Sequence, residues 1–231
     1  MAAKSFSGFP IELLHFLHEL DANNHREWFN ANKSRYERDL LEPALRFIEA
    51  MQDPLKKISP HFCAIAKRTG GSLMRIYRDT RFSHEKTPYK TNVGIQFRHE
   101  QGKDVHAPGF YFHIEPEQSF IGAGIWHPDN QVLSLIRKQI DVRSDRWKKI
   151  CRAKAFRSRF ELAGDSLKRP PQGYPADHPL IEDLRRKDHI AVAEIQTDDL
   201  FSKNIVRKTA DCFRASASYV EFLCQALQLK F

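Results

Sequence analysis

Residues 72 to 92 hold the densest group of side chains that could do chemistry: S-L-M-R-I-Y-R-D-T-R-F-S-H-E-K-T-P-Y-K-T-N. An extended segment is predicted over 73 to 82, with one face that presents Arg75, Tyr77, Asp79 and Arg81. Arginine binds carboxylate or phosphate groups bidentately, and an adjacent Asp either holds the arginine or transfers a proton. Asp79 is therefore a candidate catalytic residue. The alternative is an internal Arg–Asp network that pins the segment to the turn that follows.

That turn is predicted at Pro88, which fixes its own φ and pushes the preceding residue into an extended conformation. The turn would hold Lys86 and Lys90 on a rigid support, and Tyr89 beside them is a further candidate ligand-binding residue. Three cations as close as Arg81 and the two lysines repel one another unless an anion or several carboxylates compensate them. We therefore expect anion binding here, although an exposed basic turn would have the same sequence.

Three runs with alternating polarity follow, and each predicts a half-buried strand. They are Thr91 to His99, Phe110 to Glu115 and Ser119 to Trp126. Short connections favour an antiparallel meander whose Val, Ile and Phe face is covered by helices. The other face would present Asn92, Gln96, Tyr111, His113, Glu115, Gly122, Gly124 and Trp126.

His113 and Glu115 share this open face, and they could act as a base with an orienting carboxylate or as two metal ligands. No third ligand stands at motif spacing, so no metal site is predicted. Glycines in a strand often mark a place where a ligand approaches the backbone, and a nearby tryptophan could form a stacking wall. We expect a ligand pocket bounded by Tyr111, Gly122, Gly124 and Trp126. Cross-strand hydrogen bonding on a solvated face is the alternative.

The remaining elements must position these residues. Apolar spacing predicts helices over 9–57, basic helices over about 128–160 and a closing helix over about 197–227, with a short helix at 180–187 and a strand at 189–195. The Pro- and Gly-rich residues 164–179 predict a loop, and its side chains Lys168, Arg169 and His178 could close over the pocket. The fold class is therefore α+β: a single domain whose antiparallel, mixed-polarity sheet, with a central meander at about 72–126, is packed on one face by N- and C-terminal helices.

Composition fits one globular domain, because 41% of the 231 residues are hydrophobic. Residues 67–103 contain nine Lys or Arg and three Asp or Glu, and residues 137–169 contain twelve Lys or Arg and four Asp or Glu. Such concentration favours an anionic ligand, nucleic acid or an acidic partner, although a solvated helix face also explains the second segment. The four cysteines form no C-x-x-C pair, and neither a signal peptide nor a run of roughly 18 apolar residues is present, so we expect a reduced cytoplasmic protein without a membrane partner.

Three classes of function remain open. A small phosphorylated or carboxylated ligand in a basic pocket is favoured, with hydrolysis or group transfer conceivable, but no diagnostic nucleophile or cofactor motif is present. A nucleic-acid-binding module would use the two basic segments, with Tyr77, Tyr111 and Trp126 as stacking surfaces. A non-catalytic interaction scaffold would use the charged stretch only as a structural network. The sequence leaves the oligomeric state open.

The motif R-I-Y-R-D-T-R-F-S-H-E-K-T-P-Y-K-T resembles the signature of a widespread family of bacterial and fungal proteins known as a domain of unknown function. Further matches are F-x-G-F-P, P-G-F-Y-F-H-I-E-P, G-x-G-I-W-x-P, L-K-R and D-H-P, which together span nearly the whole chain. Glu85 stands where the family has Asp, which keeps the charge and moves it outward by a methylene. The resemblance implies a single domain and transfers no activity.

Overall fold

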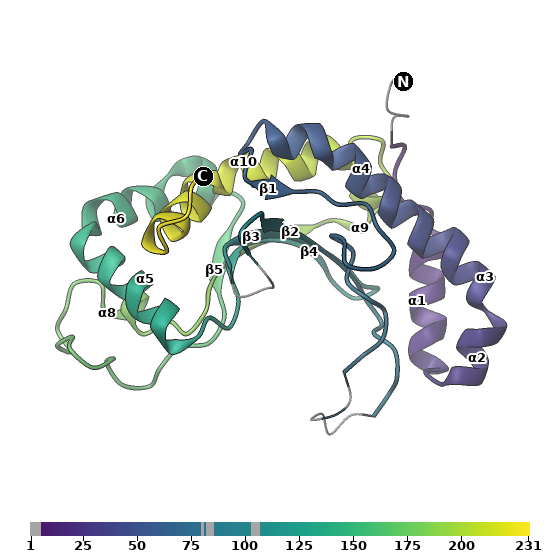
Figure 1. The fold of residues 1–231 in the computed structure, drawn as a ribbon, viewed down its shortest axis with the longest axis horizontal. Helices are drawn as coiled ribbons and strands as arrows, with labels where there is room; N and C mark the ends of the chain where they lie inside the picture. Colours follow the sequence, from purple (N-terminus) through teal and green to yellow (C-terminus); the bar gives the residue numbers. More distant parts are fainter. Residues whose placement is uncertain (1–5, 80, 82–85, 103–106) are drawn as a thin grey trace.

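A computed structural model describes residues 6–79, 81, 86–102 and 107–231, and it has the α+β architecture expected from the sequence (Figure 1). Its sheet has six strands in the order β1-β2-β3-β4-β6-β5, and every neighbouring pair is antiparallel. The strands are β1 Phe62–Cys63, β2 Val93–His99, β3 Gly109–Ile114, β4 Ser119–Ile125, β5 Glu161–Ala163 and β6 His189–Ile195. The three-stranded meander is thus confirmed, while the very short β1 and β5 had no detectable alternation.

The N-terminal residues are helical, as predicted. They form α1 Glu12–Ala22, α2 Arg26–Ala31, α3 Lys33–Arg35, the π-helical segment η1 Tyr36–Leu41 and α4 Glu42–Lys56. Figure 1 shows α4 and the long α10, Ile205–Ala226, together over one face of the sheet, while α1 to α3 stand at one end of it. None of the helices described has the length and apolarity needed to cross a membrane.

The basic segment after β4 is helical, as predicted, and it is divided into three helices. These are α5 Asn130–Val142, α6 Ser144–Arg152 and α7 Lys154–Arg157. The chain leaves the helical conformation at Ala153, whose ψ is 130°. The closing helix is also divided, into α9 Thr197–Leu200 and α10, and the short helix α8 spans Ile181–Leu184. Residues 164–179 contain no helix or strand, as predicted.

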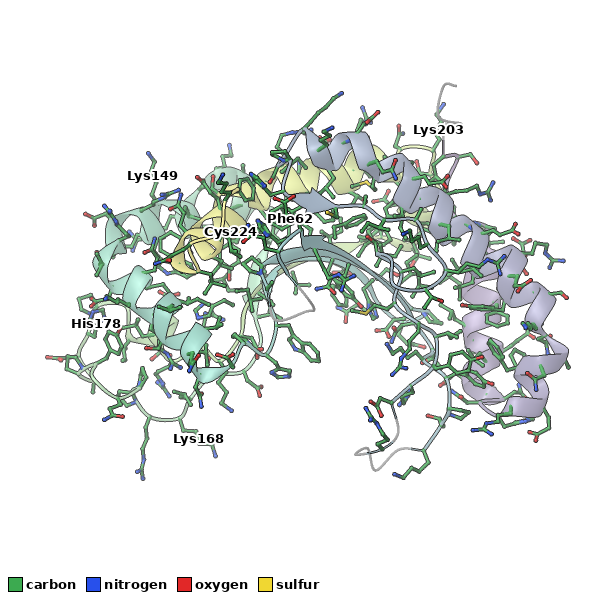
Figure 2. The ribbon with its side chains drawn as sticks, in the orientation of Figure 1. Phe62, Lys149, Lys168, His178, Lys203 and Cys224 are labelled. Atoms are coloured by element: carbon green, nitrogen blue, oxygen red, sulfur yellow. The ribbon has the colours of Figure 1, made fainter. Side chains whose placement is uncertain are left out.

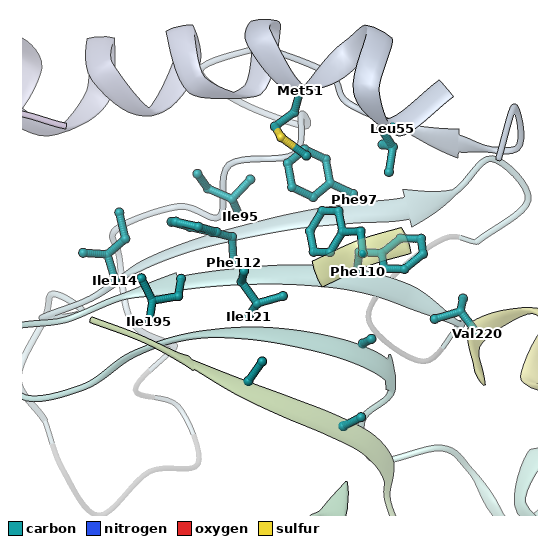
Figure 3. Close-up of a cluster of buried hydrophobic side chains, with 14 of the residues drawn as sticks. Met51, Leu55, Ile95, Phe97, Phe110, Phe112, Ile114, Ile121, Ile195 and Val220 are labelled. Atoms are coloured by element: carbon teal, nitrogen blue, oxygen red, sulfur yellow. The ribbon is translucent and has the colours of Figure 1, made fainter. Parts of the chain in front are cut away.

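The core lies between the sheet and the helices α4 and α10 (Figure 3). Phe97 and Phe110 face each other across β2 and β3, and Met51 of α4 and Val220 of α10 point toward the sheet. All four side chains are fully buried. Because side chains alternate between the faces of a strand, this packing leaves the other face of the sheet to the intervening residues.

The segment 73–82 is not the regular strand that its alternation predicted. Its only ladder contacts among the described residues are isolated bridges, from Leu73 to Ile95 and from Tyr77 to Tyr89. The exposure pattern nevertheless holds, because Arg75, Tyr77 and Asp79 are exposed while Ile76 between them is buried. Residues 80 and 82 of the predicted strand lie outside the described residues.

Residues 76–79 and 86–90 pair irregularly with each other, and we call these two described segments, together with Arg81, the basic hairpin. The Arg78 amide donates to the Pro88 carbonyl at 2.9 Å, and the Lys90 amide donates to the Ile76 carbonyl at 2.7 Å. Asn24, between α1 and α2, binds the Tyr89 backbone in both directions, since its Nδ2 donates to the carbonyl and its Oδ1 accepts from the amide, each at 3.0 Å. The basic hairpin is therefore fastened to the N-terminal helices.

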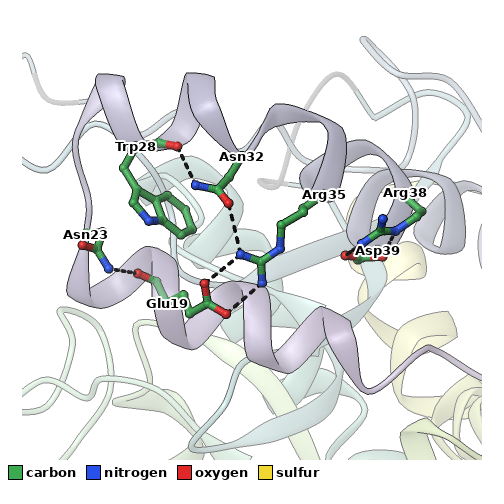
Figure 4. Close-up of polar contacts among 7 residues, drawn as sticks. All are labelled: Glu19, Asn23, Trp28, Asn32, Arg35, Arg38 and Asp39. Carbon is green, nitrogen blue, oxygen red and sulfur yellow. Dashed lines mark hydrogen bonds and ion pairs between the residues drawn. The ribbon is translucent and has the colours of Figure 1, made fainter.

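Those helices are held to one another by polar contacts (Figure 4). Arg35 donates to both carboxylate oxygens of Glu19 on α1, at 2.7 and 2.8 Å, and to Oδ1 of Asn32 at 3.1 Å. The Asn32 side chain in turn donates to the Trp28 carbonyl at 3.0 Å. This bidentate pair fixes α1 against α3, and so it supports the residues that hold the basic hairpin.

Gly124 in β4 should be the least replaceable glycine of the sheet. Its φ is +123°, and an added Cβ would lie 2.0 Å from the His189 carbonyl oxygen on β6. We expect Gly124→Ala to lower the free energy of unfolding by about 2–4 kcal/mol, because it combines left-handed strain with a backbone clash. Chemical denaturation followed by circular dichroism measures this change.

Gly122→Ala is the matched control, since its added Cβ would meet the nearest atom, Cβ of Tyr111, at 3.4 Å. We expect a loss below about 1 kcal/mol there, because reduced freedom of the unfolded chain offsets the closer contact. Equal losses for the two substitutions would contradict the conformation assigned to Gly124.

Candidate functional site

Three polar side chains lie in a row on the open face of the sheet, and we call them the Tyr111 relay. The Tyr111 hydroxyl lies 3.0 Å from Nδ1 of His113, and Nε2 of His113 lies 3.2 Å from Oε2 of Glu115. The His113–Glu115 contact has ion-pair distance without the alignment of a hydrogen bond. His113 is only 8% exposed and stacks on Phe120, with ring centroids 4.5 Å apart. The strand alternation predicted that these residues share one face.

Burial sets the protonation of the Tyr111 relay. It lowers the pKa of His113 below its ordinary value of 6.5, although the hydrogen-bonding capacity and charge of Glu115 act in the opposite direction. Burial and the charge of Glu115 raise the pKa of Tyr111 to about 12. At neutral pH the imidazole is therefore uncharged. The proximity of Glu115 to Nε2 favours the tautomer with the proton on Nε2, and in that tautomer Nδ1 accepts a hydrogen bond from the Tyr111 hydroxyl. Such a chain can pass a proton from one end to the other.

The glycines of the open face make room for Tyr111. A Cβ added to Gly94 would lie 2.6 Å from the Tyr111 hydroxyl and 3.0 Å from the Met74 sulfur. Gly122 pairs with Tyr111 across β3 and β4, and Gly124 allows the close approach of β6. Packing within the sheet thus explains why glycine occupies these positions, in addition to the ligand contact that was expected at Gly122 and Gly124. The contacts at Gly94 also bring Met74, from the segment before the basic hairpin, against the Tyr111 relay.

A pocket of about 290 Å³ adjoins the Tyr111 relay at the edge of β2, and we call it the basic pocket. Three arginines line it together with Gln96, which pairs with Tyr111 in the sheet, and these arginines are Arg68, Arg75 and Arg98. No Asp or Glu is among the described residues that line it. Arg98 donates to the Gly71 carbonyl at 3.5 Å, and Arg68 pairs with Glu37 at 3.3 Å.

Arg68, Gln96 and Arg98 were not among the ligand-binding residues predicted from the sequence. Gly70-Gly71 follows Lys67-Arg68 without the spacing of a phosphate-binding loop, so that segment had no recognisable motif. Gln96 was assigned to the open face by alternation, and Arg98 stands two positions further along the same strand. The alternation signal could therefore have identified both residues.

Lys90 links the basic pocket to the basic hairpin. Its side chain is partly buried, and its pKa is lowered first by burial and then by the nearby charges of Arg75 and Arg78. Arg75 itself makes no ion pair with any residue that the structure describes. Positive charge is therefore concentrated here at some cost in electrostatic free energy.

Asp79 and Arg81 pair directly with each other. Arg81 donates Nε and a terminal nitrogen to the two Asp79 oxygens at 3.0 and 2.7 Å, and its amide donates to Oδ1 at 3.2 Å. These bonds hold the pKa of Asp79 well below its usual range. A carboxylate held ionised in this way is a poor proton donor, so the geometry favours the network interpretation over an acid–base role. Lys86, at the other side of the undescribed residues 82–85, is exposed.

Other predicted site residues lie apart from the Tyr111 relay. Trp126 stands four positions beyond Gly122, the cross-strand partner of Tyr111, which corresponds to about 13 Å along the strand direction. Lys168 and His178 lie beside α5 and α8, across the molecule from the basic hairpin (Figure 2), and His178 pairs there with Asp141 at 3.1 Å. Arg169 follows Lys168 in the same loop. Tyr77 and Tyr89 pack together beside Phe29.

The structure therefore gathers one part of the predicted site and separates another. Arg75, Lys90 and the Tyr111 relay form one region, whereas Trp126 and the loop residues form no wall of it. Among the described residues, no group of three His, Cys, Asp or Glu side chains is placed to hold a metal ion.

A family model for conserved hypothetical proteins, DUF2461, matches residues 12–222. The chain belongs to the DUF2461 family. The match covers the Tyr111 relay, the basic pocket and the basic hairpin, and it confirms the resemblance to a family of unknown function. No curated protein matches the sequence.

Glu115 should raise the pKa of His113 in this DUF2461 domain, because its charge stabilises the imidazolium. We expect Glu115→Gln to lower the His113 pKa further, as measured by NMR titration of the imidazole resonances. Glu117→Gln, which removes an exposed charge from the same turn, is the control and should leave that pKa unchanged. A His113 pKa that rises or stays constant in Glu115→Gln would contradict the assigned contact.

Glu115→Gln should also change the stability of the protein at acidic pH. Since the folded-state pKa of His113 lies below 6.5, the unfolded chain takes up this proton first, and stability falls as the pH drops from 6.5 toward the folded-state pKa. Glu115→Gln should enlarge this loss relative to Glu117→Gln, in denaturation curves recorded between pH 7 and pH 5.

Proposed function

We propose that the protein binds a small phosphorylated or carboxylated ligand in the basic pocket, next to the Tyr111 relay. The observation that carries this proposal is the lining of the pocket, which has three arginines and no described acidic residue. Arginine is suited to such ligands, because its planar fork matches the oxygens of a carboxylate or phosphate.

Electrostatics supports an anionic occupant. Lys90 is partly desolvated beside Arg75 and Arg78, and an anion placed among these cations would reduce their mutual repulsion. The interaction-scaffold alternative requires every arginine to be neutralised within the protein. Arg75 is not neutralised in this way by an ion pair with a described residue, which favours the ligand-binding proposal.

The Tyr111 relay would supply proton transfer to a hydrolase or transferase reaction. A proton leaving the ligand would pass to the Tyr111 oxygen as the Tyr111 proton moves to Nδ1 of His113, and Glu115 would stabilise the resulting imidazolium. His113 and Glu115 are thus the candidate acid–base groups.

The nucleic-acid alternative has less support. Tyr77 and Trp126 are 54% and 52% exposed and could stack on bases, but Tyr111 is packed within its relay. The basic residues 137–169 lie mainly on α5 to α7, far from the basic hairpin in Figure 1, and Lys149 points outward from α6 in Figure 2. The described parts of the two basic segments therefore lie in different regions of the molecule.

Arg75→Ala tests the proposed site. In a screen of inorganic phosphate, phosphorylated metabolites and small carboxylates by thermal shift, we expect at least one compound to stabilise the wild type. Calorimetry of that compound should show affinity at least about tenfold weaker in Arg75→Ala, equivalent to about 1.4 kcal/mol. The reason is the loss of a bidentate, charge-assisted contact.

Arg207→Ala is the matched control, because it removes an exposed arginine from α10, away from the basic pocket. It should bind as the wild type does. Equal binding by both variants, or binding of short DNA or RNA that weakens steeply with salt and competes with the compound, would refute the proposal.

A further inference from the structure

A second pocket, of about 270 Å³, lies near the other end of the sheet, where β4 leads into α5. We call it the His127 pocket. Its polar lining comes from three separate segments and consists of His127, Asn130, Arg137 and Lys187. His127 stands five positions beyond Gly122, the cross-strand partner of Tyr111, which corresponds to about 17 Å along the strand direction. The two pockets have different lining residues, so the His127 pocket does not depend on the proposed function.

His127 has an unusual backbone. Its φ is +47°, although it is not glycine, and it precedes Pro128, a position that favours extended conformations. Such strain persists only where neighbouring contacts hold it, and it is commonest at functional sites. The neighbouring contact here is with Asp188, whose Oδ1 accepts the His127 amide proton at 2.7 Å.

Asp188 also orients the imidazole. It is 1% exposed, its Oδ1 lies 3.2 Å from Nδ1 of His127, and its Oδ2 accepts from the Asp165 amide at 2.9 Å. Gly164 permits this approach, because a Cβ there would lie 2.4 Å from Cβ of Asp188. With Nδ1 facing Asp188, Nε2 is the imidazole nitrogen that a ligand can reach.

Two cations line the His127 pocket without a described carboxylate partner. Arg137 donates only to backbone carbonyls, those of Leu184 at 2.7 Å and Arg186 at 3.2 Å, and burial lowers its pKa. Lys187 is exposed and makes no ion pair with a described residue. Asp188 contacts His127 of the lining, and its oxygens are already engaged by three donors.

We propose that the His127 pocket is a second oxyanion site, in which Lys187 and Arg137 bind the phosphate or carboxylate group of a small molecule and Nε2 of His127 hydrogen-bonds to it. Asp188 is the positioning residue. A purely structural role for Asp188, which ties β4 and the 164–179 loop to the start of β6, would explain the strained backbone. It would not explain why Arg137 and Lys187 line the pocket without a carboxylate partner among the described residues.

Chemical modification of His127 tests this site, because 53% of its side chain is exposed. The rate of carbethoxylation by diethyl pyrocarbonate is measured for each histidine by peptide mass spectrometry, with and without inorganic phosphate. Chloride keeps the ionic strength constant, and the pH is fixed. We expect the His127 rate to fall about fourfold at a phosphate concentration about three times the dissociation constant, while exposed His15 on α1 is unaffected.

Lys187→Ala should abolish this protection, and Lys203→Ala, which removes an exposed lysine before α10, should retain it. Arg75→Ala should also retain it, which separates this site from the basic pocket. A His127 rate that phosphate in the millimolar range does not change, or protection that survives Lys187→Ala, would overturn the proposal. Small carboxylates tested in the same assay show which oxyanion the pocket prefers.

Discussion

The alternation of side chains along β2, β3 and β4 is the constraint on which the rest of the structure depends. Phe97, Phe110 and Phe112 must face α4 and α10 for the core to form, and this places Tyr111 and His113 on the opposite face. A slip of one residue in β3 would expose the phenylalanines and bury the polar pair under the helices. The geometry of the candidate site is therefore a consequence of core packing.

The same alternation decided which elements could be predicted from the sequence. Strands of six or seven residues carry several alternations, and β2, β3, β4 and β6 were recognised. The two-residue β1 and three-residue β5 are defined by their partners and carry no periodic signal. For residues 73–79 the exposure pattern could be predicted but the hydrogen bonding could not. Exposure follows local polarity, whereas the hydrogen bonding of this region depends on distant groups such as Asn24.

In the candidate site, too, contacts between residues close in the sequence could be predicted and contacts between distant residues could not. Tyr111, His113 and Glu115 are neighbours on one strand and its turn, so their common face could be predicted. The contact between His127 and Asp188 joins residues that are 61 positions apart in the sequence. It also depends on a positive φ at His127, which the sequence Trp126-His127-Pro128 does not indicate. The basic pocket was predicted only in part: Arg75 was identified, whereas Arg68, from an irregular segment, and Arg98, from β2, were not.

Charge compensation explains why the basic hairpin and the basic pocket favour a small anion over a macromolecular surface. Asp79 is occupied by Arg81, and so it cannot also pair closely with Arg75 or Lys90. The repulsion that remains acts on side chains held by a backbone that Asn24 and Phe29 anchor, so the cations cannot separate without loss of those contacts. In the proposed complex a compact oxyanion would relieve this repulsion from a single point, and its binding would stabilise the basic hairpin by linkage.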